Sequence, residues 1–317
     1  MSAAISSYRA PFWLPGGHLQ TLWPWFFSAR PQLPWQRERL ELPDGDFLDI
    51  DWLGGPAERP LVIAFHGLEG SARGHYMLAL AQAVSRAGGR FAAVNFRGCS
   101  GEPNRLARAY FAGDSTEIGQ VIRRLKPRAQ GPVHAVGYSL GGNALLLWLA
   151  EQQDSAREWL SRAVAVSAPL DLPAAGRTLD RGAARLIYTG HFLRSLKRKA
   201  RELAQRHPGH FDLARVEQAR TLHDFDQHFT APLHGYASAE AYWQTAASLP
   251  GLRRIAVDTL LINARNDPFL PAETLPDASR ISPAITCEFP EQGGHAGFPG
   301  SEWLLRRILT HLDLDQP

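Results

Sequence analysis

The stretch from Val133 to Asn143 constrains the fold of this chain more than any other. An apolar run leads into Ser139, which has a glycine two residues before it and two residues after it, and a second apolar run starts at Leu140. This order predicts a strand, a sharp turn and a helix. The backbone of a serine on such a turn crowds the positions two residues away, and Gly137 and Gly141 relieve that crowding. The Ser139 hydroxyl should therefore stand at a sheet edge beside the free N–H groups of a helix N-terminus, as in a nucleophile elbow.

Short apolar runs recur on both sides of this elbow, and helical patterns separate them. Continuously apolar runs are typical of central strands that are covered on both faces. The candidate strands lie at 61–65, 91–96, 133–138, 163–166, 259–263 and 284–289. Apolar residues at helical spacing predict helices at 76–87, at 118–125 after the Asp114–Glu117 capping box, at 140–150 and after Ser301. This alternation predicts an α/β fold with a mostly parallel central sheet and helices on both faces.

Two further runs precede the central strands. Residues 39–42 and 47–52 flank the turn Pro43-Asp44-Gly45-Asp46. A turn of the Asp-Gly type between two such runs predicts an antiparallel hairpin. With this hairpin included, residues 163–166 form the sixth strand of the predicted sheet.

The alternation of strands and helices breaks once, between Pro169 and about Gly251. This stretch is largely helical by composition, so we expect a helical lid inserted after the sixth core strand. The predicted organisation comprises an aromatic N-terminal segment at 1–36 that packs on the core or the lid, an α/β core at 37–169 and 252–317, and a helical lid at 170–251.

Two segments of the sequence have alternative interpretations. The basic run Arg194–Arg201 predicts a solvated helix face, with contact to anionic lipid or an acidic substrate as the alternative. Aromatic residues and prolines are dense at 11–27, and we expect this segment to wrap the main domain and bury its rings. The alternative is a patch that touches a membrane or a partner. We also expect an apolar pocket above Ser139, roofed by phenylalanines of the lid together with Trp13, Leu14, Trp23 and Trp25.

The composition excludes several classes of protein. Lys and Arg total 34 against 31 for Asp and Glu, an excess of 34 − 31 = 3, which gives no argument for nucleic-acid binding. The two cysteines, Cys99 and Cys287, are too few for a disulfide framework. No charged leader with an apolar core opens the sequence, and no apolar run reaches the roughly 20 residues that a bilayer requires. We therefore expect a cytoplasmic protein; the oligomeric state stays open.

A serine nucleophile requires a base, and the base requires an acid that holds its tautomer. Asp267 follows an apolar strand directly, and His295 lies in the glycine-rich loop after the last strand. Loops that contact ligands in open α/β sheets gather at those strand ends. We therefore predict Ser139, Asp267 and His295 as a catalytic triad. Asp171, which follows the sixth strand, is the alternative acid.

An oxyanion hole also requires two backbone N–H donors. We assign one to Leu140, the residue after the nucleophile, and the other to Leu68 in the His66–Gly70 stretch after the third strand. For His66 and His134 we expect structural hydrogen bonds rather than catalysis.

With these residues in hand, the chain resembles the YheT-like α/β-hydrolase family, which includes bacterial hydrolases and eukaryotic abhydrolase-domain lipases and ethyl-ester synthases. The resemblance runs through Gly16–Thr21, His66–Gly70, Asn95–Asn104, the elbow, Phe225-Asp226, His234–Tyr236, Asp267–Phe269 and Gly293–His295. Where relatives often have Tyr-His-Ser-Gly, this chain has Tyr110-Phe111-Ala112-Gly113.

The resemblance implies an α/β-hydrolase fold and hydrolysis of carboxylic esters, with Ser139, Asp267 and His295 as the triad. It implies no cofactor and no metal. We expect a small apolar ester of medium or long acyl chain as substrate, no nucleic acid, and contact with membrane or lipid as an open possibility. An alcohol acyltransferase or a thioesterase would use the same triad, and a non-catalytic hydrolase-fold protein that binds an apolar ligand is the alternative from another class.

Overall fold

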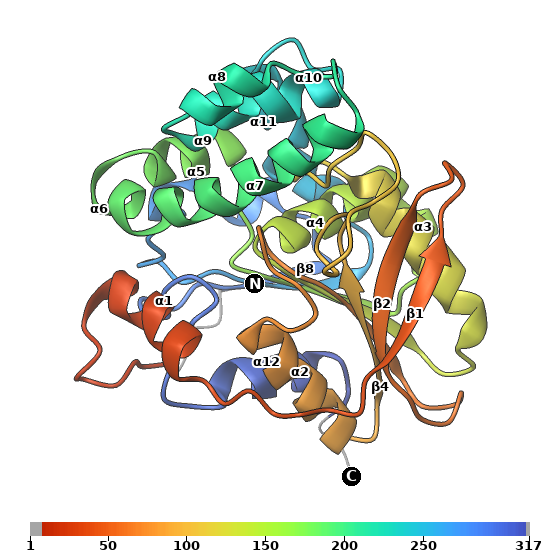
Figure 1. The fold of residues 1–317 in the computed structure, drawn as a ribbon. Coiled ribbons are helices and arrows are strands. Elements are labelled where there is room, and N and C mark those ends of the chain that lie inside the picture. Colours follow the sequence, from red (N-terminus) through yellow and green to blue (C-terminus); the bar gives the residue numbers. More distant parts are fainter. Residues whose placement is uncertain (1–7, 315–317) are drawn as a thin grey trace.

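A mostly parallel sheet forms the centre of the computed structural model, which describes residues 8–314 (Figure 1). Residues 1–7 of the predicted N-terminal segment and 315–317 of the predicted core lie outside the described residues. Within the described part, eight strands pair in the order β1-β2-β4-β3-β5-β6-β7-β8. Their bounds are β1 Gln36–Glu41, β2 Phe47–Leu53, β3 Leu61–Phe65, β4 Arg90–Asn95, β5 Val133–Tyr138, β6 Arg162–Val166, β7 Asp258–Ile262 and β8 Ile285–Glu288.

The direction of the strands agrees with the sequence pattern. β1 and β2 form the predicted antiparallel hairpin, in which Leu40 faces Leu48, and β2 also runs antiparallel to β4. All other neighbouring strands are parallel. The residues of β3 and β5 are buried throughout, because helices cover both faces of the sheet. The α/β class and the mostly parallel sheet are therefore confirmed.

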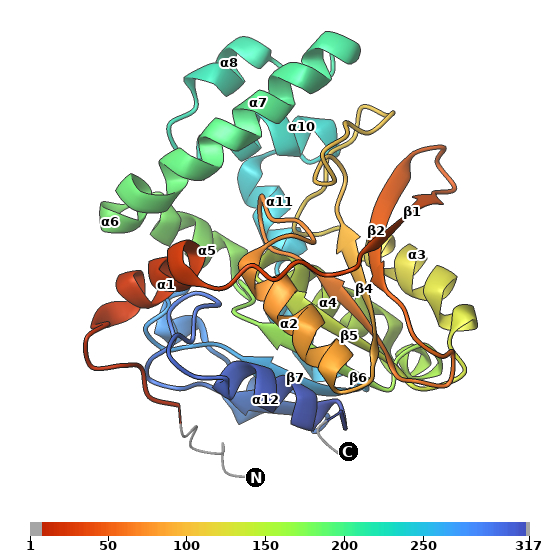
Figure 2. The ribbon, with the colours of Figure 1, turned by 60° about the horizontal axis from the view of Figure 1, so that its bottom comes forward.

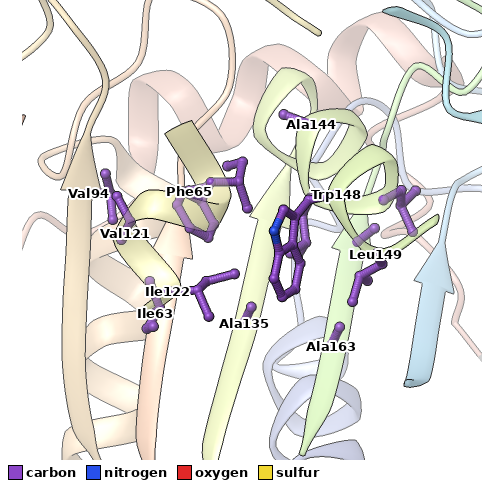
Figure 3. Close-up of a cluster of buried hydrophobic side chains, with 14 of the residues drawn as sticks. Ile63, Phe65, Val94, Val121, Ile122, Ala135, Ala144, Trp148, Leu149 and Ala163 are labelled. Carbon is purple, nitrogen blue, oxygen red and sulfur yellow. The ribbon is translucent and has the colours of Figure 1, made fainter. Parts of the chain in front are cut away.

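Four helices cover the two faces of the sheet. Helices α3 (Ser115–Leu125) and α4 (Leu140–Gln152) pack on one face, and α2 (His75–Arg86) and α12 (Trp303–His311) pack side by side on the other (Figures 1 and 2). Figure 3 shows Trp148 of α4 lying over Ala135 of β5 and Ala163 of β6. The two small side chains leave room for the indole, which is fully buried.

A buried arginine ties the hairpin to the core. The Arg97 guanidinium donates to the carboxylates of Asp44, Asp46 and Glu117. The Asn104 side chain donates to Asp46 and to the carbonyl oxygen of Phe47. These bonds satisfy a guanidinium that would otherwise be buried without partners. Arg97 and Asn104 therefore hold the hairpin against the core.

Between β6 and β7 the chain forms a helical insertion above the sheet (Figure 2). Its helices are α5 Leu172–Leu179, α6 Gly182–Ala184, α7 Gly190–Arg206, α8 Leu213–Gln218, α9 Leu222–Phe225, α10 Ala231–Leu233 and α11 Ala239–Ala246, with π-helical turns at Arg185–Thr189 and Asp226–Thr230. Most of its apolar residues form a core of their own, which also includes Phe269 and Leu270. The insertion is therefore a packed unit rather than an open loop.

The N-terminal aromatic segment differs from its prediction. It forms a helix, α1 (Gly16–Phe27), that contains Pro24. The expectation that it buries its rings is wrong, because Phe12 is 95% exposed and Phe26 and Phe27 are 64% and 65% exposed. The inner face of the helix instead holds polar groups, with Gln20 fully buried. No helix among residues 8–314 combines the length and apolar character that a membrane span requires.

Candidate active site

Ser139 alone makes the turn between β5 and α4. Its φ of 51° and ψ of −121° lie in a region that residues other than glycine rarely adopt. The Ser139 N–H donates to the carbonyl oxygen of Val166 on the neighbouring strand at 2.8 Å. A Cβ atom on Gly137 would lie 2.6 Å from the carbonyl oxygen of Gly141, so the turn closes only with glycine at this position. The elbow predicted from the sequence is therefore present in the structure.

The three predicted triad residues form one hydrogen-bonded chain. His295 Nε2 lies 2.9 Å from Ser139 Oγ, and His295 Nδ1 lies 2.8 Å from Asp267 Oδ2. An ionised carboxylate only accepts hydrogen bonds, so Nδ1 carries the proton and Nε2 accepts from the serine hydroxyl. The Asp267 side chain is fully buried. The chain of bonds can therefore pass the serine proton to the imidazole.

The loop that contains Asp267 holds the side chains of both Asp267 and His295 in position. Asp267 Oδ1 accepts from the N–H of Phe269 at 2.8 Å, and the Phe269 ring stacks on the His295 imidazole with centroids 4.0 Å apart. The alternative acid, Asp171, instead accepts from the N–H of Ala174 and caps α5. Asp267, and not Asp171, is therefore the carboxylate that contacts His295 in the structure.

Two residues of α1, which sequence reasoning did not assign to the site, tie its loops together. Gln20 Oε1 accepts from the Asn266 side chain at 2.9 Å and from the N–H of Gly293 at 2.8 Å. Thr21 Oγ1 accepts from the N–H of His295 at 2.9 Å. A Cβ atom on Gly17 would lie 1.8 Å from the carbonyl oxygen of Asn266. The resemblance had marked Gly16–Thr21 as a motif, and these contacts supply its physical reason.

On the other side of His295, Ser167 holds the loop. Its hydroxyl oxygen accepts from the N–H of Ala296 at 2.9 Å, and its own φ is 50°. Sequence reasoning also missed this residue. A serine directly after the sixth strand was the available signal, since that strand end borders the elbow.

Tyrosines fix the loop that is predicted to supply the second oxyanion donor. The N–H of Gly67 donates to the Tyr76 hydroxyl at 2.9 Å, and the N–H of Glu69 donates to the Tyr110 hydroxyl at 2.7 Å. Within residues 8–314, the N–H of Leu68 between them has no acceptor. A Cβ atom on Gly67 would lie 3.0 Å from Ser139 Cβ, so this loop lies against the nucleophile. A free N–H next to the serine suits an oxyanion donor.

An ion pair joins this loop to the helical insertion. Lys199 Nζ of α7 lies 2.7 Å from Glu69 Oε1 and 3.2 Å from Cys99 Sγ. Burial disfavours the Glu69 carboxylate, but Lys199, together with hydrogen bonds from Ser195 and Tyr110, outweighs that penalty and lowers the pKa of Glu69. The predicted solvated face of the basic run thus holds for Arg194 and Arg198, which are exposed, and is wrong for Lys199.

Of the two histidines expected to make structural hydrogen bonds, His66 makes them within the described residues and His134 does not. His66 Nδ1 lies 2.8 Å from the carbonyl oxygen of Gly67, and His66 Nε2 accepts from the N–H of Phe96. Burial lowers the pKa of His66 to about 4. The expectation is wrong for His134, because neither of its buried ring nitrogens has a hydrogen-bond partner among residues 8–314.

A cavity of about 740 Å³ opens beside Ser139. The oxyanion loop, the elbow and His295 form its floor, and α1 and the helical insertion contribute apolar walls. The apolar side chains that line the cavity include Leu22, Trp25, Leu179, Phe192, Leu196, Phe225 and Phe229, with Phe269 and Leu270 from the loop after β7. Trp13, Leu14 and Trp23 do not line the cavity, so their expected place in its roof is wrong. Among the described residues, no group of three His, Cys, Asp or Glu side chains converges as metal ligands would.

Comparisons with known proteins find relatives over nearly the whole chain. Residues 60–300 match the family model described as alpha/beta hydrolase fold. YheT of Escherichia coli (strain K12), provisionally named an esterase, is 38% identical over 303 residues, which cover 92% of this chain and 88% of YheT. Human phospholipase ABHD3 is 25% identical over 319 residues, which cover 97% of this chain and 76% of that protein. The Pyrococcus furiosus esterase Pf2001 superposes with a TM-score of 0.59 at 16% identity, over 88% of this chain and 90% of that chain.

Proposed function

Since this chain belongs to the YheT-like α/β-hydrolase family, we propose that it is a serine hydrolase that cleaves carboxylic esters of medium or long acyl chains through an acyl-serine intermediate. One observation carries the proposal: Ser139, His295 and Asp267 form a hydrogen-bonded chain at the floor of a cavity with apolar walls. A site that only binds ligands requires no such chain, because the buried carboxylate serves to orient a base.

The proposed reaction begins when Ser139 Oγ attacks the carbonyl carbon of the ester and His295 Nε2 takes the hydroxyl proton. The Asp267 carboxylate stabilises the imidazolium that forms. The N–H groups of Leu68 and Leu140 donate to the oxyanion, and each donor is worth about 3 kcal/mol in the transition state. His295 then protonates the leaving alcohol, which leaves an acyl-serine. Water, deprotonated by the same imidazole, releases the acid and restores the serine.

The walls of the cavity support an acyl chain as the part of the substrate that is recognised. Leu179, Phe192 and Leu196 of the insertion and Leu22 of α1 offer apolar surface for such a chain. Charged side chains, among them Arg73, Lys199 and Glu202, also line the cavity. The relatives named phospholipase support a lipid ester as the substrate class. Burial of one methylene is worth about 0.8 kcal/mol, so kcat/KM should rise up to about fourfold per added methylene until the cavity is full.

A fluorophosphonate probe tests the nucleophile. We expect the probe to label the wild-type protein at Ser139, and Ser139→Ala to abolish labelling and ester turnover. Ser71, which also lines the cavity, provides the matched control, because Ser71→Ala should keep both. A folded wild-type protein that a small probe leaves unlabelled would favour the non-catalytic ligand-binding alternative.

A panel of 4-nitrophenyl esters from acetyl to dodecanoyl tests the substrate class. We expect kcat/KM to rise with chain length, whereas a strict preference for acetyl esters would refute the acyl-chain proposal and leave the nucleophile intact. The same panel with a competing alcohol separates hydrolysis from acyl transfer, because acyl transfer yields a new ester instead of the free acid. Comparison of kcat/KM for oxygen esters and for thioesters of the same acyl chain separates an esterase from a thioesterase.

A further inference from the structure

All of the large apolar side chains that are exposed among residues 8–314 lie on two segments. One segment is residues 12–27, which comprise α1 and the turn before it, and the other is Leu186 with Ile187 in a π-helical turn of the insertion. Phe12 and Leu186 are the most exposed, at 95% and 85%. We call these side chains the exposed apolar patch. Such a concentration on one part of a surface marks an interaction site.

The two segments form one surface. His18 Nδ1 of α1 lies 3.1 Å from the Tyr188 hydroxyl, and their rings stack. The rings of Trp25 and His191 lie 4.9 Å apart. Both ribbon views place α1 next to α6 at one side of the molecule (Figures 1 and 2). The patch therefore spans the junction between the N-terminal helix and the helical insertion.

This junction is also an entrance to the cavity of Ser139. Trp25 and Ile187 line the cavity, and each is 39% exposed to solvent. Side chains that face both the cavity and the solvent stand at its rim. A molecule held on the exposed apolar patch thus lies next to an opening that leads to the candidate nucleophile.

The charged side chains that flank the two segments have one sign. Residues 8–36 and 181–201 contain arginines and lysines but no aspartate or glutamate. Arg9, Arg30, Arg181, Arg185 and Arg194 are exposed. Within the described residues none of these five forms an ion pair. Exposed Trp and Phe flanked by unpaired arginines are the composition of a surface that lies on anionic lipid.

We propose that the exposed apolar patch docks this protein on an anionic lipid surface, from which the acyl chain of a substrate enters the cavity past Trp25 and Ile187. The entry step rests on the proposed function, whereas docking does not. A second copy of this chain fits the patch less well. It would cover the rim residues of the cavity, and a two-fold interface would bring the arginines of both copies together.

Vesicle flotation with the full chain tests the docking. We expect the wild-type protein to float with vesicles of phosphatidylcholine and phosphatidylglycerol, and far less with phosphatidylcholine alone. Phe26→Ser/Phe27→Ser should lower partitioning by roughly tenfold, because two exposed rings no longer enter the interface. Arg181→Ser/Arg185→Ser should lower partitioning by about 25-fold at low salt, since each arginine near an anionic surface is worth about fivefold.

Three controls make the outcome specific. Arg123→Ser/Arg124→Ser removes two exposed charges of α3 and should leave partitioning unchanged. The double phenylalanine variant and the Arg181→Ser/Arg185→Ser variant should both hydrolyse 4-nitrophenyl butyrate at the wild-type rate, because none of the four substituted residues lines the cavity. Ser139→Ala should bind vesicles normally, so failure of docking and failure of catalysis are distinguished.

Two results would overturn the docking proposal. In the first, wild-type protein stays unbound at anionic vesicles. In the second, sedimentation velocity shows a dimer that Phe26→Ser/Phe27→Ser dissociates, which would assign the patch to a second copy of the chain.

Discussion

The two oxygens of Asp267 have different partners, and this difference separates its role from that of Asp171. Oδ2 faces His295 Nδ1, and Oδ1 holds the N–H of Phe269. Asp267→Asn keeps the shape but removes the charge that stabilises the imidazolium and fixes its tautomer. We expect kcat to fall by ~10⁴-fold, as it does when a triad aspartate becomes an amide, with KM for a medium-chain 4-nitrophenyl ester nearly unchanged.

Asp171→Asn is the matched control. Asp171 caps α5 through its side chain, and asparagine caps a helix about as well as aspartate. Activity and melting temperature should therefore stay close to wild type. If Asp171→Asn lowered kcat more than Asp267→Asn in a folded protein, Asp171 would be the acid.

Among single residues, the sequence predicted those whose side-chain type the proposed reaction requires. Ser139, Asp267 and His295 each follow a strand end in a turn or glycine-rich loop, and their order limits the choice. For Gln20 and Ser167 the sequence offers only weaker signals, a family motif and a serine directly after a strand, and neither signal names the partner that the side chain contacts. Gln20 contacts Gly293 across 273 positions, and Ser167 contacts its partner loop across 129. Contacts of that separation follow from the assembled fold and not from local sequence.

At the scale of elements, the close approach of α4 to the oxyanion loop depends on one glycine. A Cβ atom on Gly141 would lie 2.5 Å from the carbonyl oxygen of His66 and 2.7 Å from that of Phe65. Gly141→Ala therefore has to move backbone. We expect a loss of about 3 kcal/mol in the free energy of unfolding, at the upper end of overpacking effects, measured by urea denaturation.

Gly190→Ala tests whether this loss comes from the close approach rather than from glycine as such. Gly190 has helical angles, with φ −62° and ψ −33°, and no atom lies within 4 Å of an added Cβ. At this exposed position of α7, alanine should stabilise the protein by about 0.5–1 kcal/mol. An equal loss in both variants would contradict the packing argument.

Most elements were predictable because their patterns are strong. The buried strands are continuous apolar runs in the sequence. Their alternation with helical patterns predicted the α/β class. Helix α1 was not predicted, because its Gly-Gly start and Pro24 are signals against a helix. The predicted capping box forms only in part: Asp114 accepts from the N–H of Glu117, but the Glu117 carboxylate pairs with Arg97 instead of returning to the cap. A buried guanidinium is the stronger partner.

At the scale of the whole molecule, buried histidines should make the fold sensitive to acid. Burial lowers the pKa of His66, His75, His134 and His234 to about 4 each, against about 6.5 in an unfolded chain. Between pH 6.5 and 4 the unfolded chain binds protons that the folded chain does not, so stability falls as pH falls through this window. Asp226 and Glu117 act in the opposite direction, because burial raises their pKa values to about 6 and about 7.

His134→Leu isolates one part of this effect. Arg162, His311 and Asp313 are the charged or titratable groups that act on this imidazole. Leucine removes the titration and two unpaired ring nitrogens, so the urea midpoint should rise at pH 7.5 and should change less between pH 6.5 and 4. For one buried group the pH-dependent gain approaches about 3 kcal/mol near pH 4.

His210→Leu serves as the control for this titration. His210 is exposed, so its replacement should leave the pH dependence of the urea midpoint as in wild type. An unchanged slope in His134→Leu would show that other groups cause the acid sensitivity.

The bonds between α1 and the loop of His295 join parts of the chain that emerge from the ribosome at different times. Gln20 and Gly293 are 273 positions apart, so roughly 15–55 s separate their emergence at about 5–20 residues per second. During that interval the Gln20 side chain, which is buried in the complete fold, lacks the loop that binds it. Ser139 likewise precedes its proposed base, so a growing chain cannot acquire the proposed hydrolytic activity before His295 has emerged.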